Sequence, residues 1–221
     1  MLLLGFGNKA RQGKDTAAEA IKRYYDLQNE SRRRHVRSYR GTQVGLYKFA
    51  GSLYDEVNQA LRNNIWKTRT VDGIKLPDWV QPDPNPEVSS IAPLGKHPKL
   101  LQWWGTELRR SQNPNYWVDK TMRSIRAELI NPKAIAIITD VRFPNEADAI
   151  KSNGGYTINV QRLLSDGTQY LDPNRPVDHP SETALDNYNW DFYIKIVEPH
   201  VVLLEEQAIT LCEYLKQLGP R

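Results

Sequence analysis

The 221-residue chain lacks several features that mark secreted and membrane proteins. It has a single cysteine, Cys212, so no disulfide can form within the chain, and we expect this residue to be a core or helix-face residue rather than a nucleophile. No apolar run approaches the ~20 residues of a membrane span. The apolar run 2–4 is too short for a signal peptide and has no cleavage pattern after it. Together these absences predict a cytoplasmic, globular protein without a membrane partner.

Motifs of several hydrolytic and metal-dependent chemistries are also missing. No His/Cys cluster has the spacing of a zinc site, and no nucleophile elbow is present. His179 and Ser181 lie close in sequence, but no third group completes a triad, so we interpret His179 as a hydrogen-bonding residue that positions a loop. The chain has neither repeats nor low-complexity segments, and its length suits one sizeable domain, 1–221.

Positive charge is in modest excess, with a formal net charge of +4. This balance favours an anionic ligand. The densest basic run covers residues 32–35, and Arg37 and Arg40 follow it. We interpret this run as the solvated end of a helix, where basic side chains are favourable, with a nucleic-acid-binding patch as the alternative.

A glycine-containing basic loop is the most informative stretch of the sequence. It follows the apolar run 2–7 and precedes a helix-forming segment, which is the context of a phosphate-binding P-loop. In such a loop the backbone N–H groups and the first turn of the helix face an anion. Lys14 would reach the outer phosphates as a point charge. We therefore assign the nucleotide phosphates to Asn8, Ala10, Arg11, Gly13 and Lys14.

The loop departs in two ways from the strict pattern G-x-x-x-x-G-K-[ST]. Asn8 stands where the first glycine belongs, so either the turn starts at Gly7 with an extra residue or Asn8 adopts a left-handed backbone. Asp15 stands where the hydroxyl residue belongs, and Thr16 follows one position late. We assign the metal to Asp15, Thr16 and, from a later strand, Asp140. The simpler alternative is a basic turn that only joins a strand to a helix.

Apolar periodicity predicts an α/β protein whose mostly parallel sheet is covered by helices on both faces. The predicted strands are 2–7, 44–50, 134–140, 156–162 and 191–197. The predicted helices are 14–28, 52–61 with Ser52 as N-cap, 99–111, 116–129, 146–152 with Asn145 as N-cap, 181–187 and 201–218. Between them, the proline-rich stretch 63–98 is irregular and longer than a typical loop.

In a parallel sheet, ligands bind beyond the carboxyl ends of the strands, where the basic loop should meet other polar groups. Asp140 ends the clearest strand and would hold magnesium through water, with capping of the next turn as the alternative. Arg142 follows it and suits either bidentate phosphate binding or a salt bridge to Glu146. Arg162 and Arg175 flank a loop that could close over phosphates and bring in an arginine, or could be an ordinary exposed loop.

One predicted helix combines aromatic and basic side chains. Trp103 and Trp104 precede Arg109 and Arg110 on it, and a guanidinium beside a flat ring suits a phosphate next to a base. In the alternative interpretation, one tryptophan packs in the core and one arginine faces solvent. We assign these four residues to substrate binding.

Six segments spread over most of the chain form a specific combination. They are Gly13-Lys14-Asp15-Thr16, Phe49-Ala50, the stretch 101–109, Tyr116-Trp117-Val118, the stretch 140–147 and His179-Pro180-Ser181-Glu182. In these segments the chain resembles the bacteriophage deoxynucleoside monophosphate kinases, and GKDT together with DVRFPNEA is the specific part. The stretch 63–98 has no clear counterpart in that family.

The resemblance implies a P-loop NTPase/kinase-like three-layer sandwich, with an inserted helical monophosphate-binding part at 62–130 and a lid-like loop at 163–180. It implies ATP and Mg²⁺ as cofactors and a small-molecule dNMP as substrate, which the γ-phosphoryl group converts to dNDP. Residues 13–16 would hold the ATP phosphates and the metal. Asp140 and Arg142 would serve the catalytic centre, and Arg109 the acceptor phosphate. Beside what the resemblance implies, we count Lys14, Arg162 and Arg175 among the catalytic candidates and Phe49 among the substrate-binding candidates.

Other functions are compatible with the sequence. One is a P-loop kinase of a small metabolite, of the dephospho-coenzyme A or shikimate type. Another is a nucleic-acid-binding protein that has a degenerate P-loop and uses the basic run 32–40, although we do not expect a nucleic-acid partner. A third is a structural virion protein. The aromatic residues of the stretch 63–98 are compatible with a homodimer.

Overall fold

The computed structural model describes residues 1–35, 41–173, 178, 180–198 and 200–220. The chain divides into two compact units, which we call unit 1 (Met1–Lys48 and Met122–Arg221) and unit 2 (Phe49–Thr121). Unit 2 overlaps the stretch 62–130, to which the family resemblance assigns the monophosphate. That assignment stays a prediction.

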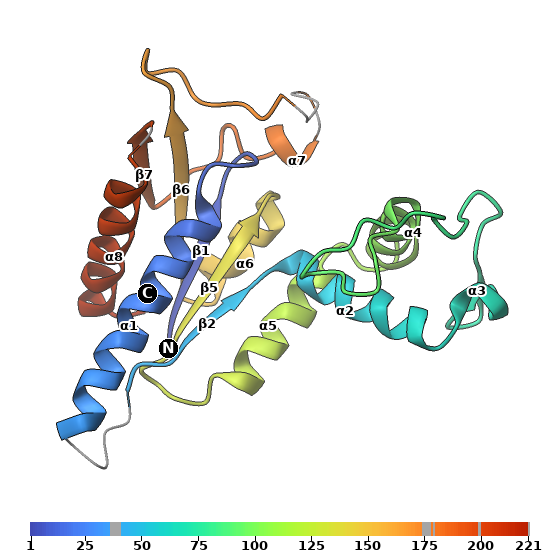
Figure 1. Cartoon of the computed structure of the whole chain (residues 1–221), viewed down its shortest axis with the longest axis horizontal. Helices are drawn as coiled ribbons and strands as arrows, with labels where there is room; N and C mark the ends of the chain where they lie inside the picture. Colours follow the sequence, from blue (N-terminus) through green and yellow to red (C-terminus); the bar gives the residue numbers. More distant parts are fainter. Residues whose placement is uncertain (36–40, 174–177, 179, 199, 221) are drawn as a thin grey trace. The chain divides into compact units, whose positions relative to one another are not determined.

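Unit 1 contains a five-stranded sheet in which every strand pair is parallel. Its strands are β1 (Leu2–Gly7), β2 (Val44–Tyr47), β5 (Ile135–Val141), β6 (Tyr156–Leu163) and β7 (Phe192–Val197). Their spatial order is β2-β5-β1-β6-β7, so β1 is the central strand (Figure 1). The predicted α/β class and parallel sheet are confirmed. The strand predicted at 44–50 ends earlier than expected because Phe49 begins a helix.

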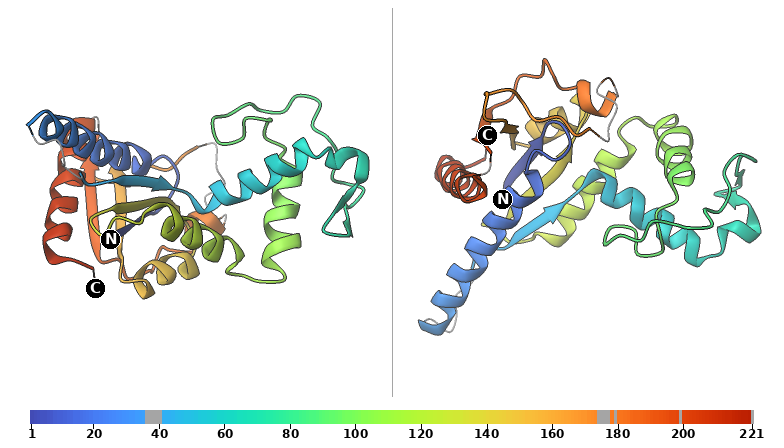
Figure 2. Two further views of the ribbon diagram at one scale, coloured as in Figure 1. Left: turned by 90° about the horizontal axis from the view of Figure 1, so that it is seen from below. Right: turned by 45° about the horizontal axis from the view of Figure 1, so that its top comes forward.

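Helices cover both faces of this sheet. On one face, α1 (Lys14–His35) packs beside α8 (Val201–Leu218), and α6 (Pro144–Ser152) lies on the other face (Figure 2). All of β1 and nearly all of β5 are buried as a result. This double cover explains why both strands are continuous apolar runs rather than alternating patterns.

Cys212 of α8 belongs to the core of unit 1, as predicted. Its side chain is 1% exposed, and burial raises the pKa of its thiol to about 12. The neighbouring carboxylate of Glu213 acts in the same direction. Cys212 is therefore a packing residue and not a nucleophile.

The first helix is longer than predicted. The sequence indicated an end near residue 28, but α1 continues to His35. Its last turn contains Arg32, Arg33 and Arg34, whose side chains are exposed. The basic run is thus a solvated helix end, where positive charge offsets the negative end of the helix dipole. Arg37 and Arg40 lie outside the described residues.

Both predicted N-caps are wrong. In unit 2, α2 (Phe49–Arg62) begins at the buried Phe49, three residues before Ser52. The Ser52 hydroxyl instead lies 3.0 Å from that of Thr121. In unit 1, α6 begins at Pro144, before Asn145. Proline suits a first helical position because its missing N–H is not needed there.

Glu146, rather than Asn145, satisfies the start of α6. Its carboxylate accepts hydrogen bonds from the backbone N–H groups of Arg142 (2.8 Å) and Phe143 (3.1 Å). A buried carboxylate therefore fixes the exit from β5, next to the residues predicted to bind phosphate.

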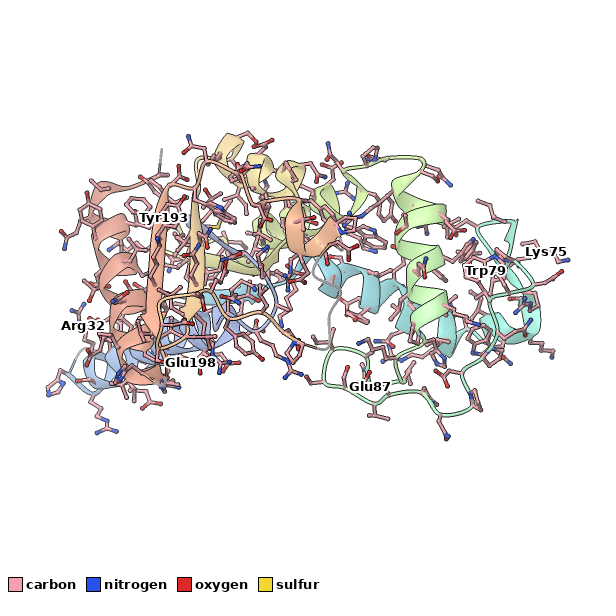
Figure 3. The ribbon with its side chains drawn as sticks, turned by 90° about the horizontal axis from the view of Figure 1, so that it is seen from above. Arg32, Lys75, Trp79, Glu87, Tyr193 and Glu198 are labelled. Atoms are coloured by element: carbon pink, nitrogen blue, oxygen red, sulfur yellow. The ribbon has the colours of Figure 1, made fainter. Side chains whose placement is uncertain are left out.

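Unit 2 has its own apolar core, built from short elements. After α2 come α3 (Ile65–Thr68), a hairpin of β3 (Thr70–Val71) and β4 (Ile74–Lys75), α4 (Pro98–Gln102), a π-helix η1 (Trp103–Arg110) and α5 (Tyr116–Glu128), within which the unit ends. The core includes Leu76, Val80, Leu100, Trp104 and Leu108. Lys75 and Trp79, both exposed, mark the region of the hairpin in Figure 3.

The helix predicted at 99–111 is α-helical only over its first turn. From Trp103 to Arg110 it is a π-helix, and the Ser111 N–H donates to the Thr106 carbonyl, five residues back (3.0 Å). This wider turn places residues five apart on the same side of the helix. Trp104 and Arg109 are such a pair.

The remaining elements differ little from expectation. The segment predicted at 181–187 is helical only in α7 (Pro180–Thr183), because Asp186 N–H then bonds to the Thr183 carbonyl three residues back (3.0 Å) and forms a turn.

None of the helices in the described part of the chain has the length and hydropathy that crossing a bilayer requires.

Candidate functional site

The loop between β1 and α1 is held in a tight, unusual backbone conformation. Asn8, Arg11 and Gly13 all have positive φ angles, of 105°, 54° and 92°. Asn8 thus takes the turn position itself, the second of the two alternatives that the sequence left open. Its side-chain amide donates to Asn159 Oδ1 (2.7 Å) and to the Val160 carbonyl (3.2 Å), so β6 fixes the start of the loop.

Two glycines allow the close packing of this loop. A Cβ on Gly7 would lie 2.1 Å from the ring of Trp190, and a Cβ on Gly13 would lie 2.7 Å from Leu204. Both distances are shorter than van der Waals contact allows. Any other residue at either position would therefore displace the loop or its neighbours.

Lys14, the first residue of α1, folds back over the loop. Its side chain is buried, and its Nζ donates to the carbonyl oxygens of Asn8 (3.2 Å) and Lys9 (2.5 Å). Burial lowers the pKa of Lys14 to about 7, and repulsion by Arg142 adds to the effect, against the attraction of nearby carboxylates. The predicted phosphate lysine is thus enclosed in the loop and is not turned to bulk solvent.

Arg142 converges on the same point from the end of β5. Its NH1 donates to the Asn8 carbonyl (2.9 Å) and lies 3.2 Å from Glu182 Oε1. The described guanidinium contacts pair Arg142 with Glu182, while Glu146 accepts the backbone N–H of Arg142. The structure therefore brings Lys14 and Arg142 together at one loop carbonyl.

Glu182 of α7 is a site residue to which sequence reasoning gave no role. Its carboxylate is buried and accepts the Ala10 N–H of the loop (2.8 Å) in addition to pairing with Arg142. Lys9 strengthens this attachment by donating to the Glu182 carbonyl and to Asp186, both at 2.6 Å. The only sequence signal was the position of Glu182 in a family-like segment.

Carboxylates and hydroxyls lie beside the start of α1. Asp15 accepts a hydrogen bond from Thr139 (2.6 Å) and pairs with Lys48 Nζ (3.0 Å). Asp140 follows Thr139 on β5, just before Val141, which pairs with Gly7 of β1. Thr16 is half-buried. Within the described ranges, no three His, Cys, Asp or Glu side chains gather so that they could hold a metal by themselves.

The end of β6 and the segment after it also contact the β1–α1 loop. The buried side chain of Gln12 accepts the Arg162 N–H (2.8 Å) and donates to the Tyr170 carbonyl (2.7 Å). Arg11 pairs with Asp172 (3.0 Å). The Arg162 guanidinium instead pairs with Glu198, labelled in Figure 3, and lies 4.2 Å from the Tyr170 ring centroid.

The described contacts of Arg162 therefore do not bring its guanidinium to Lys14. Arg175 and His179 lie outside the described residues, and so does part of the predicted lid-like loop 163–180.

Unit 2 contains a separate group of polar side chains, the Glu56 cluster, made of Glu56, Trp104, Arg109, Tyr116 and Lys120. The carboxylate of Glu56 accepts hydrogen bonds from Trp104 Nε1 (2.8 Å), Arg109 Nε (2.6 Å), Tyr116 OH (2.9 Å) and Lys120 Nζ (2.5 Å). Burial acts to raise the pKa of Glu56, but these donors lower it overall. The π-helix explains how Trp104 and Arg109 reach the same oxygen.

Arg109 is the best-enclosed cation of this cluster. Its guanidinium carbon lies 5.0 Å from the Tyr116 ring centroid and 6.0 Å from that of Trp104. Its NH2 also lies 2.7 Å from Asp72 Oδ2. A planar cation fixed by carboxylates and rings is prepared for bidentate binding of an anion.

The other residues predicted to bind substrate are mostly packing residues. Trp103 and Trp104 are only 4% and 2% exposed, and Phe49 is 2% exposed. Their burial is explained by the core of unit 2 and the start of α2, and a role in stacking on a base stays a prediction. Arg110 is half-buried.

Comparisons with known proteins give limited but relevant similarity. No protein-family model matches the chain. Over 103 residues it is 35% identical to a protein of Acanthamoeba polyphaga mimivirus named "Putative deoxynucleotide monophosphate kinase". The match covers 39% of this chain and 46% of the viral protein, so less than half of that relative's length is represented.

One solved structure resembles the chain along its full length. It is an unliganded sugar kinase from Janibacter sp. HTCC2649, with 9% identity and a TM-score of 0.41, covering 100% of this chain and 99% of that one. At this identity and TM-score the similarity bears on neither the fold nor the function.

Proposed function

We propose that the chain is an ATP-dependent deoxynucleoside monophosphate kinase that converts dNMP to dNDP. The observation that carries the proposal is the convergence of buried Lys14 and Arg142 on the Asn8 carbonyl, at the end of the central strand. Such a position, where the chain turns to opposite sides of a parallel sheet, is where this class of fold binds ligands. The similarity to the viral protein supports the choice of substrate.

In this proposal the β1–α1 loop and Lys14 bind the ATP phosphates. A phosphate oxygen of the acceptor forms a bond to the γ-phosphorus while the bond from that phosphorus to the bridging β-oxygen breaks, and ADP leaves. Phosphoryl transfer needs little covalent help from protein groups. Lys14 and Arg142 act by holding positive charge against the oxygens on which negative charge develops.

Asp140 and Asp15 are the residues that would hold Mg²⁺. Both are close enough to Lys14 for their charges to raise its pKa. Magnesium usually binds one or two carboxylates and completes its shell with phosphate oxygens and water, so this donor set fits the ion. The ion would neutralise charge on the phosphates of the nucleotide.

We assign the acceptor to unit 2, where Arg109 and Lys120 are the cations of the Glu56 cluster. Glu56 orients both through hydrogen bonds. A positioned guanidinium binds a phosphate through two parallel hydrogen bonds and so fixes its orientation. Fixed orientation of the acceptor is a large part of what an enzyme contributes to a reaction between two bound substrates.

A coupled assay of ADP release tests the proposal, with each dNMP offered in turn and with dephospho-coenzyme A and shikimate as competing acceptors. We expect turnover with dNMPs. Lys14→Ala should fold but lose on the order of 3 kcal/mol of transition-state stabilisation, or about 100-fold in turnover.

Lys22→Ala is the matched control for this experiment. Lys22 is also on α1, but it is exposed and pairs with Asp26 one turn away (2.7 Å). This variant should keep its turnover. Full activity in Lys14→Ala, or ATP turnover that no dNMP stimulates, would contradict the proposal.

A further inference from the structure

Arg109 contacts two carboxylates of very different exposure. Glu56 Oε1 lies 2.5 Å from Arg109 NH2, and Asp72 Oδ2 lies 2.7 Å from the same nitrogen. The side chain of Glu56 is 12% exposed and that of Arg109 is 14% exposed, whereas that of Asp72 is 64% exposed. The same guanidinium nitrogen is therefore paired with one largely enclosed carboxylate and with one carboxylate that is mostly exposed to water.

Asp72 is held in place by the turn of the β3–β4 hairpin. It forms a two-residue turn with Gly73, and both residues have positive φ, 48° and 80°, as a type I′ turn requires. The base of the hairpin is fixed by the Leu76 N–H, which donates to the Arg69 carbonyl (2.8 Å), and by the Arg69 guanidinium, which donates to Val80 (2.7 Å). These contacts fix the hairpin so that the Asp72 carboxylate at its turn lies beside Arg109.

The two carboxylates differ in how easily an anion could replace them. Exposed ion pairs contribute little to stability, because water already solvates both partners. Removing a largely enclosed partner such as Glu56 leaves the buried Trp104 Nε1 without its acceptor, which costs far more. An incoming phosphate carries more charge than a carboxylate and matches the guanidinium fork. Asp72 is the partner that such an anion would displace.

We propose that Asp72 is an internal counter-anion that occupies Arg109 until the phosphate of the acceptor replaces it, and so sets the affinity for the acceptor. The identity of the acceptor rests on the proposed function. Asp72 competes with the monophosphate for the NH2 nitrogen of Arg109. This gives the proline-rich stretch that carries the hairpin a role in substrate affinity.

Asp72→Asn tests the proposal, because asparagine keeps the shape of the side chain, tolerates positive φ and removes the charge. Calorimetric titration with each dNMP, without ATP, should show binding about fivefold tighter than in the wild-type protein, the factor expected from the upper range for an exposed ion pair. In turnover, the acceptor KM should fall by a similar factor while kcat does not rise. ATP affinity should be unchanged.

Asp78→Asn is the matched control. Asp78 lies in the same stretch, is 92% exposed and has its charge 3.9 Å from Lys75. It should bind dNMPs as the wild-type protein does. Thermal unfolding of each variant reports whether the hairpin change affects folding.

The outcomes separate this inference from the proposed function. If the wild-type protein binds a dNMP and Asp72→Asn binds it equally or more weakly, the counter-anion role is overturned while the kinase proposal stands. If neither protein binds any dNMP, both are overturned.

Discussion

Lys14 has an unusual charge state for a residue that we propose binds phosphate. Burial and the nearby guanidinium of Arg142 lower its pKa to about 7. Near neutral pH, part of the ligand-free protein therefore holds this amine without its proton. A bound phosphate adds negative charge beside the amine and favours the protonated form. The proposed function therefore predicts that phosphate binding and proton uptake are coupled at this residue.

The coupling predicts a measurable pH dependence. At about pH 8, above the lowered pKa, ATP binding should take up close to one proton per site, and affinity should fall as pH rises further. The sign follows because the deprotonated amine must gain a proton before it can pair with phosphate. Isothermal titration calorimetry in buffers of different ionisation enthalpy measures the uptake directly.

Lys14→Met should bind ATP with little proton uptake and, since it removes a buried amine, should remain folded. Lys22→Ala should take up protons as the wild-type protein does. Equal uptake in Lys14→Met and wild type would show that another group gains the proton.

At the scale of elements, several hydrogen bonds and ion pairs attach the short helix α7 and the turn after it to the β1–α1 loop and to Arg142. The Glu182 carboxylate accepts the Ala10 N–H and pairs with Arg142, and Lys9 donates to the Glu182 backbone carbonyl and to Asp186. The contacts differ in burial, since the Glu182 side chain is 7% exposed and that of Asp186 is 48% exposed. The buried contact should therefore carry most of the energy.

Glu182→Ala should lower the free energy of unfolding by about 2 kcal/mol, because it leaves a loop N–H and part of a guanidinium without an acceptor. Asp186→Ala removes only a surface ion pair and should cost about 0.5 kcal/mol. Urea denaturation of the two variants compares them directly. Equal losses would mean that α7 is attached mainly by its surface charges.

The sequence predicted the elements better than it predicted their contacts. Buried parallel strands leave a local signature of continuous apolar residues, so β1 and β5 were found. The contact of Glu182 with Ala10 joins residues 172 positions apart, and no local pattern encodes such a pair. The π-helix was not predicted either. Trp104 and Arg109 of this helix both donate to Glu56 of α2, and this contact between distant residues leaves no local sequence pattern.

The candidate site likewise contains residues that the sequence predicted, while the start positions of two helices were predicted wrongly. Lys14 and Arg142 were predicted because each follows a strand, and the topology brings the ends of neighbouring parallel strands together. The N-cap predictions failed because Phe49 and Pro144 start their helices earlier, through burial and ring geometry that capping patterns do not contain.

At the scale of the whole molecule, the two compact units divide the chain unequally. Unit 1 is built from two separated segments, and unit 2 is one continuous segment. In the proposed function, the phosphoryl donor binds to unit 1 and the acceptor to unit 2. Each ligand should therefore protect a different part of the sequence.

Hydrogen–deuterium exchange tests this division. A non-hydrolysable ATP analogue alone should slow exchange in peptides from 1–48 and 122–198, most strongly in the β1–α1 loop. A dNMP alone should slow exchange within 49–121, around the Glu56 cluster. Protection by dNMP that is confined to unit 1 would contradict the assignment of the acceptor.

The burial of Cys212 has a practical consequence. It is the sole sulfhydryl of the chain, it lies on the buried face of α8 with 1% of its surface exposed, and its elevated pKa keeps it in the unreactive thiol form. A thiol-specific dye added to the native protein must therefore wait until α8 leaves the sheet. The rate of dye incorporation therefore measures how often α8 separates from the sheet, and it does so without an engineered label.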